Sequence, residues 1–108
     1  MQTQNVVVYR SVNAAGQVQY VGITRNLEVR AAAHLAEKGI EIAPIPGLLN
    51  LSRADARAVE QVLINIYGLG KNGGTLLNRI NSIATIHPIY EQAIQRGTER
   101  LAQVGYPF

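Results

Sequence analysis

Cysteine is absent from this chain, so disulfide bonds and thiolate metal sites are excluded, and the redox state of the compartment is not constrained. Charged residues make up only 16% of the sequence, and a net charge of +3 is too small to identify a nucleic-acid-binding protein by itself. No apolar run is long enough to span a membrane, and no signal peptide is expected at the start. Because 47% of the 108 residues are hydrophobic, one core can be buried, and we expect residues 1–108 to form a single domain.

Two β-rich runs open the chain. They cover residues 5–12 and 17–23 and are separated by the turn-forming residues 13–16. This pattern predicts an antiparallel hairpin. If the four-residue loop is closed symmetrically, Tyr9 lies directly opposite Tyr20, and both rings share one face of the sheet. A single bulge would instead shift the register by one and send one ring to the other face.

A helix is predicted over residues 27–38, with an Asn or Thr cap before it and Gly39 as its stop. Arg30 and His34 are four positions apart and therefore share one face of this helix. Apolar residues, Leu35 among them, are expected to pack on the sheet. Arginine offers a planar fork to phosphate oxygens, and histidine exchanges a proton near neutral pH. The helix therefore suits an anionic substrate, although a solvated polar stripe is the plainer interpretation.

A second helix is predicted from Ser52 to Tyr67, where Ser52 and Asp55 have the spacing of a capping box. The centre of its apolar stripe is formed by Val59, Val62, Leu63 and Ile66. Glu60 lies at the edge of that stripe. It can form a surface ion pair with Arg57, or it can be a hard oxygen ligand for Mg²⁺, which takes one or two carboxylates and keeps its waters.

The remaining segments complete an α+β fold, a small antiparallel sheet of about three strands flanked by helices. Residues 39–47 can supply the third strand, ended by prolines at a sheet edge. Residues 88–103 form a packing helix, preceded by His87 as a loop or capping residue. Residues 68–73 fit a dinucleotide-binding glycine pattern, but they follow a helix rather than a strand, so a flexible loop carrying Lys71 is preferred.

Five elements in this order resemble the GIY-YIG nuclease domain. They are Val7-Val8-Tyr9, Tyr20-Val21-Gly22, the helix bearing Arg30 and His34, Glu60 on the second helix, and Asn78 in Leu76-Leu77-Asn78-Arg79. The resemblance covers about residues 6–82 and leaves the helix at about 88–103 outside. Valine replaces the glycine and isoleucine of the first motif and the isoleucine of the second, which are apolar backbone positions.

The resemblance implies a phosphodiesterase that hydrolyses nucleic acid by attack of water, with Mg²⁺ or Mn²⁺ held by Glu60. The residues that it assigns to catalysis are Tyr9, Tyr20, Arg30, His34, Glu60 and Asn78. Tyr9 would accept the proton of the attacking water, unless the metal acidifies the water and Tyr9 only orients it. Gly22 would be structural. The basic residues expected to contact nucleic acid are Arg25, Arg57 and Lys71.

DNA is the expected substrate in preference to RNA. Residues 70–78 are similar to a stretch of toxin-type members, which implies the C-terminal effector domain of a bacterial polymorphic toxin. Such a domain would act in the cytoplasm of a target bacterium after delivery as part of a larger secreted toxin, and a cognate immunity protein would cover its site. The alternatives are a small repair or mobile-element nuclease, and a non-catalytic nucleic-acid-binding or protein-interaction module of the same fold.

Overall fold

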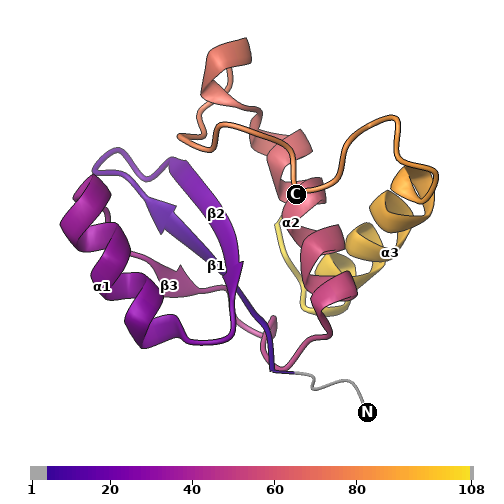
Figure 1. The fold of residues 1–108 in the computed structure, drawn as a ribbon, viewed down its shortest axis with the longest axis horizontal. Helices are drawn as coiled ribbons and strands as arrows, with labels where there is room; N and C mark the ends of the chain where they lie inside the picture. The colour runs from indigo at the N-terminus through magenta and orange to yellow at the C-terminus, as the bar shows by residue number, and fades with distance from the viewer. Residues whose placement is uncertain (1–4, 108) are drawn as a thin grey trace.

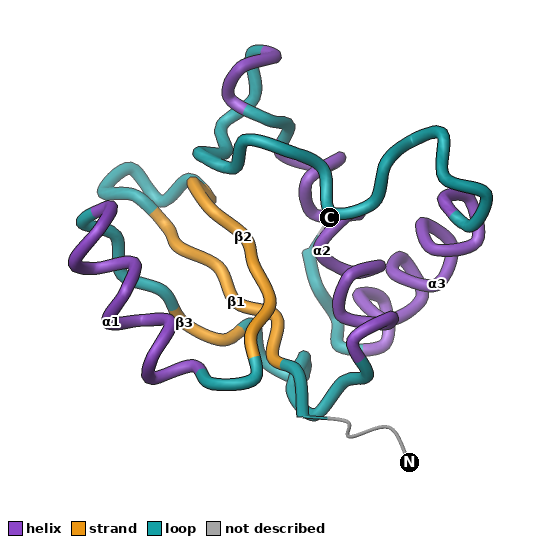
Figure 2. Tube along the Cα trace, viewed as in Figure 1, coloured by secondary structure: helices purple, strands orange, loops and turns teal. Residues whose placement is uncertain are grey.

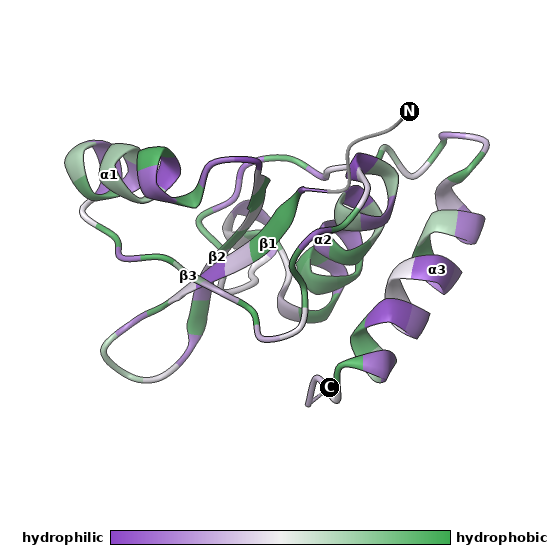
Figure 3. Cartoon of the chain, turned by 90° about the horizontal axis from the view of Figure 1, so that it is seen from below, coloured by the Kyte–Doolittle hydropathy of each residue, from purple (hydrophilic) through white to green (hydrophobic). Residues whose placement is uncertain are grey.

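The computed structural model describes residues 5–107 and has the predicted α+β fold. Strands β1 (Val7–Val12) and β2 (Val18–Thr24) form the hairpin, and the short β3 (Ala43–Pro44) pairs with the other side of β1. The sheet is antiparallel with the order β2-β1-β3, so β1 is central and β2 is an edge strand. Two views place this sheet between α1 on one side and α2 with α3 on the other (Figures 1 and 3).

The hairpin loop is one residue longer than predicted. Asn13 donates its backbone N–H to the carbonyl of Gln17, and its side chain accepts from the N–H of Gln17 as well. Val12 therefore pairs with Val18. One residue further into the hairpin, the register shifts again, because Gln19 is left without a partner on β1 as a bulge.

These two shifts decide where the tyrosines lie. Tyr9 pairs with Gly22 and Ser11 pairs with Tyr20, so the prediction that Tyr9 lies directly opposite Tyr20 is wrong. Because two one-residue shifts restore the original parity, both rings still lie on one face. They are stacked diagonal neighbours, with centroids 6.3 Å apart and planes inclined by 14°.

Helix α1 spans Leu27–Lys38, as predicted. The Asn26 side chain caps its N-terminus, and Gly39 ends it in the left-handed conformation with φ of 65°. The buried residue of this helix is His34, whereas Leu35 is 56% exposed. The prediction that Leu35 packs on the sheet is wrong, because adjacent helical residues point about 100° apart and His34 occupies the inward position.

Helix α2 (Arg53–Tyr67) is the central helix of the core. It packs against the sheet with one side and against α3 (Tyr90–Gln103) with another, and Figure 3 shows hydrophobic residues alternating with polar ones along it. Val59 and Leu63 are fully buried, as predicted, but Ile66 is 40% exposed. Ile66 points in the same direction as Val59 and Val62, but it lies in the last turn of α2, one residue before the helix ends.

Two contacts lock α3 onto α2. The carboxylate of Asp55 accepts hydrogen bonds from Arg96 and Arg100 on α3. It therefore holds the two helices together, while Ser52 alone caps α2 by accepting from the Asp55 N–H. Gly97 permits close approach, because a Cβ there would overlap the carbonyl of Ala58.

The glycine-rich segment after α2 is a closed turn. It contains the short helix η1 (Gly70–Asn72), and a bridge between Leu69 and Leu76 ties its two ends together. Figure 2 shows this excursion projecting beyond the end of α2. Lys71 is exposed on it. Over residues 5–107, no helix has the length and apolar character needed to cross a membrane.

Candidate active site

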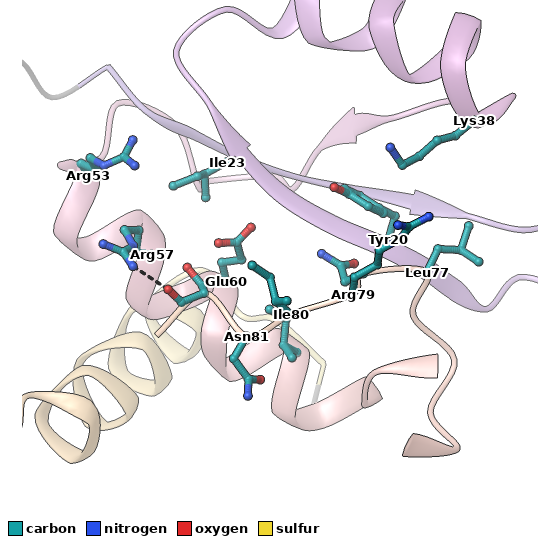
Figure 4. A pocket seen from close by; sticks show the side chains of 13 residues that line it. Tyr20, Ile23, Lys38, Arg53, Arg57, Glu60, Leu77, Arg79, Ile80 and Asn81 are labelled. Atoms are coloured by element: carbon teal, nitrogen blue, oxygen red, sulfur yellow. Dashed lines mark hydrogen bonds between the residues drawn. The ribbon is translucent and has the colours of Figure 1, made fainter. Parts of the chain in front are cut away.

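A cleft of about 560 Å³ lies at the edge of the sheet, between β2, α2 and the segment 77–82 (Figure 4). Its charged lining residues are Lys38, Arg53, Arg57, Arg79 and Glu60. Four cations around one carboxylate create a positive cleft with a single hard oxygen donor. Such a lining suits a polyanion and a divalent cation together.

Helix α2 contributes one wall of the cleft. Arg53, Arg57 and Glu60 are spaced at i, i+4 and i+7, so they share one helix face. Arg57 donates a hydrogen bond to the carbonyl of Ser82 on the facing segment. Burial raises the pKa of Glu60, and the hydrogen bond with Ser82 and the two arginines oppose this effect. The carboxylate is therefore partly desolvated, and a cation in the cleft would stabilise its charge.

Strand position separates the two tyrosines. Tyr20, on the edge strand β2, lines the cleft, whereas Tyr9, on the central strand, is 2% exposed and lies behind it. Burial raises the pKa of Tyr9, the neighbouring Tyr20 and Glu60 add to the increase, and Arg30 opposes it. The pKa of Tyr20 is raised by burial and by Glu60, again against Arg30. Both phenols are therefore protonated at neutral pH in the unliganded protein.

His34 joins the tyrosines into one cluster. Its Nε2 lies 2.9 Å from the hydroxyl of Tyr9, and its ring meets Tyr20 edge to face with centroids 4.7 Å apart. Burial lowers the pKa of His34, and the charges of Lys38 and Arg30 lower it further. A neutral imidazole has one N–H donor and one acceptor nitrogen, so the tautomer of His34 decides which partner donates in the bond between Tyr9 and Nε2.

Gly22 and Asn78 shape the cleft by contact with the hairpin. A Cβ at Gly22 would overlap the ring and hydroxyl of Tyr9, which agrees with a structural role for this glycine. The Asn78 side chain donates to the Val21 carbonyl at 2.8 Å and accepts from the Val21 N–H at 3.1 Å. This two-point contact extends the edge of β2 and fixes the segment that faces α2.

The predicted site residues thus divide into two groups. The structure brings together Tyr9, Tyr20, His34, Arg57, Glu60 and Asn78, in the cleft or directly behind it. Arg30 is exposed on α1 and is not part of the cleft lining, although its charge reaches both tyrosines. Arg25 and Lys71 are exposed and lie outside the lining, so their predicted contact with nucleic acid gains no support from the cleft.

Three cations of the cleft were missed among the predicted site residues. Arg53 could have been found from its spacing of four and seven residues before Arg57 and Glu60. Lys38 lies one turn after His34 on α1, and its ammonium is 5.9 Å from the centroid of the Tyr20 ring. Arg79 carried no periodic signal, because it belongs to an irregular segment positioned by distant residues.

The chemistry of the lining fits a Mg²⁺ or Mn²⁺ ion at Glu60. Mg²⁺ commonly uses one or two carboxylates and fills its other positions with water and substrate phosphate oxygens. Glu60 supplies one partly desolvated carboxylate, and the cleft leaves room for water and phosphate. Within residues 5–107 there is no cluster of three or more His, Cys, Asp or Glu side chains that could form an all-protein cage.

Comparison of the sequence with known protein families gives a match over the N-terminal part of the chain, which carries Tyr9, Tyr20 and His34. Residues 5–46 match the family model of the GIY-YIG catalytic domain, which confirms the resemblance found in the sequence. The match includes both tyrosines and the helix bearing His34, whereas Glu60 and Asn78 lie beyond it. It supports nuclease activity, a nucleic acid substrate and use of a divalent metal. No curated protein and no solved structure matches the chain.

Proposed function

We propose that this chain, whose residues 5–46 match the family model of the GIY-YIG catalytic domain, is a metal-dependent endonuclease that hydrolyses phosphodiester bonds, with DNA preferred over RNA. The observation that carries the proposal is the cleft in which Glu60 and Tyr20 lie among four cations. The cations hold the phosphates of a bound strand, and the carboxylate would hold Mg²⁺ or Mn²⁺ beside them. When bound, such an ion polarises a phosphate oxygen and lowers the pKa of a coordinated water.

The half-buried tyrosine of the edge strand is the one that contacts the reacting groups. Tyr20 lines the cleft and keeps its proton at neutral pH, so it donates a hydrogen bond to a phosphate oxygen or orients the attacking water. Tyr9 is buried and hydrogen-bonded to His34. This geometry favours Tyr20 for the role at the water that the resemblance gave to Tyr9, with Tyr9 and His34 holding the Tyr20 ring in place.

The cations at the two ends of the cleft neutralise different phosphates of a bound strand. Arg53 and Arg57 lie at one end of the cleft and Lys38 at the other (Figure 4), so a strand running between them passes over Glu60. Arg30 stabilises negative charge near the tyrosines from the surface of α1. Arginine keeps its charge throughout the working pH range, so these contacts persist while the reacting phosphate gains charge.

A cleavage assay with matched variants tests the proposal. Purified protein with Mg²⁺ should cut plasmid DNA, chelation should stop the cutting, and an RNA substrate of the same sequence should be cut more slowly. Glu60→Gln should abolish cleavage while the fold persists, because a neutral amide removes the desolvation of a charge. Glu99→Gln, an exposed change on α3, is the control. Cleavage by Glu60→Gln at the wild-type rate would refute the assignment.

The same domain is proposed to act as a toxin effector in the cytoplasm of a target bacterium, with an immunity protein seated over the cleft. The similarity of residues 70–78 to toxin-type members supports this context. Induced cytoplasmic expression should halt growth and degrade DNA, and Glu60→Gln should be harmless at the same protein level. Unimpaired growth with the active form would refute the toxin role while leaving the nuclease proposal intact.

A further inference from the structure

Apolar side chains are exposed inside this basic cleft. Ile80 is 73% exposed and Leu77 is 52% exposed, and both line the cleft with Ile23. Phosphate groups are bound by cations and hydrogen-bond donors, so these apolar groups contribute nothing to phosphate recognition. A group of exposed apolar residues at a binding site indicates an apolar surface on the ligand.

The segment that carries Ile80 is held on both sides. Before it, Asn78 makes its two-point contact with Val21. After it, the side chain of Gln61 donates to Asn81 at 3.0 Å and accepts from the N–H of Ile83 at 2.8 Å. Ile80 therefore lies on a short, anchored arch, and little conformational entropy is lost when a ligand contacts it.

The position of Ile80 within the cleft limits which part of a bound strand it can contact. Figure 4 shows Ile80 beside Glu60, in the middle of the cleft, with Arg53 and Arg57 at one end and Lys38 at the other. A strand whose phosphates contact both ends presents a sugar and a base between them. In an intact duplex the faces of the bases are covered by stacking, so an aliphatic side chain reaches a base face only where a step is opened or unpaired.

We infer that Ile80 is a specificity-determining residue that contacts the face of an unstacked nucleobase, so that the enzyme prefers single-stranded or locally unpaired nucleic acid to intact duplex. This inference rests on the proposed nuclease function and adds the substrate class. An intact duplex must be opened at one step before the same contact forms, so it is the poorer substrate.

Cleavage of three substrates of one sequence tests the inference. These are a perfect duplex, the same duplex with one unpaired nucleotide, and the single strand. Wild-type protein should cut the two unpaired substrates with kcat/KM at least roughly tenfold higher than the duplex, given the cost of opening one step. Ile80→Ser should lower that ratio toward one, and Ile80→Leu should retain it. Ile86→Ser is the control, because Ile86 is 92% exposed and does not line the cleft.

A binding measurement decides the inference independently of activity. Glu60→Gln protein is titrated into oligonucleotides that carry 2-aminopurine at the unpaired position. The fluorescence of 2-aminopurine reports a change in the stacking of that base. The inference is supported if the unpaired oligonucleotide binds more tightly than the paired one and its fluorescence changes, and if adding Ile80→Ser to the Glu60→Gln protein removes both effects. Equal binding of paired and unpaired oligonucleotides overturns it, as does equal cleavage of all three substrates. Absence of any cleavage by wild-type protein refutes the nuclease proposal instead, and the binding result still decides the role of Ile80.

Discussion

Replacement of Gln61 by leucine tests how the far wall of the cleft is held. Gln61 is 0% exposed on α2, one residue after Glu60. Its Nε2 donates to Asn65 and Asn81, each at 3.0 Å, and its Oε1 accepts from the N–H of Ile83. Leucine has a similar volume and no polar atoms, so the change removes three hydrogen bonds while leaving little cavity.

The magnitude follows from the group that is left unpaired. Loss of the acceptor leaves the buried N–H of Ile83 unsatisfied, which costs about 1–3 kcal/mol. The bonds to Asn65 and Asn81 are partly exposed and contribute about 0.5–1.5 kcal/mol each, against which leucine gains some apolar burial. We expect Gln61→Leu to lower the free energy of unfolding by about 2–4 kcal/mol. Domains of this size commonly have about 5–15 kcal/mol of stability, so the variant should still fold.

Urea unfolding monitored by circular dichroism measures the change. The midpoint should fall by roughly 1–2 M at an unchanged slope. Gln95→Leu, an exposed glutamine on α3, should leave the midpoint unchanged. Asn65→Ala removes the bonds of Asn65 to Gln61 and Tyr90 and should lower stability by about 1–2 kcal/mol, less than Gln61→Leu. If Gln61→Leu and Asn65→Ala have equal effects, the Ile83 contact contributes nothing and the reasoning is wrong. Cleavage activity of folded Gln61→Leu should also fall, because its wall of the cleft is no longer anchored.

Three further changes probe the hairpin, the proton-bearing cluster and the helix pair. Gly22→Ala should lower stability by about 1–3 kcal/mol and reduce kcat, because the new Cβ overlaps Tyr9; unchanged unfolding and kinetics would contradict this packing. Burial lowers the pKa of His34 below its usual value of 6.5, so below pH 6.5 the unfolded chain binds more protons than the folded protein. The free energy of unfolding should therefore have its full value above pH 6.5 and fall as the pH decreases through the folded pKa. Unfolding of wild type and His34→Gln between about pH 5 and about pH 8 should show a smaller pH dependence for the variant, and identical profiles would exclude this histidine as the cause. Gly97→Ala should destabilise the α2–α3 contact by about 1–3 kcal/mol in urea unfolding, whereas Gly105→Ala, where a Cβ meets no neighbour but φ is 69°, reports backbone strain alone.

Local signals explain which parts of the fold were predictable. The bounds of α1 follow from Asn26 and Gly39, and the start of α2 follows from Ser52, because each of these residues acts on the turn beside it. The hairpin was predictable as a hairpin but not in register. The Asn13 side chain determines the loop length and Gln19 forms a bulge, and neither feature has a sequence pattern of its own.

The cleft was predictable on one side only. Glu60 stands out because it is a single carboxylate at the edge of an apolar stripe, and the tyrosine motifs stand out by their spacing. The opposite wall depends on contacts between residues far apart in the chain, such as Asn78 with Val21 and Gln61 with Ile83. Such contacts leave no periodicity in the sequence. The exposure of Ile80 could not be predicted for the same reason, because the segment that carries it is positioned by these distant contacts.

The separation of the two tyrosines is the feature that most changes the chemistry expected from the motif. Sequence order alone makes Tyr9 and Tyr20 equivalent proton carriers, but the sheet order places one on the central strand and the other at the edge. Burial then raises the pKa of Tyr9, and its hydroxyl is hydrogen-bonded to His34. A group that is both covered and protonated is poorly placed to take a proton from water. The edge position of Tyr20, rather than the identity of the side chain, is therefore what makes it the tyrosine available to substrate.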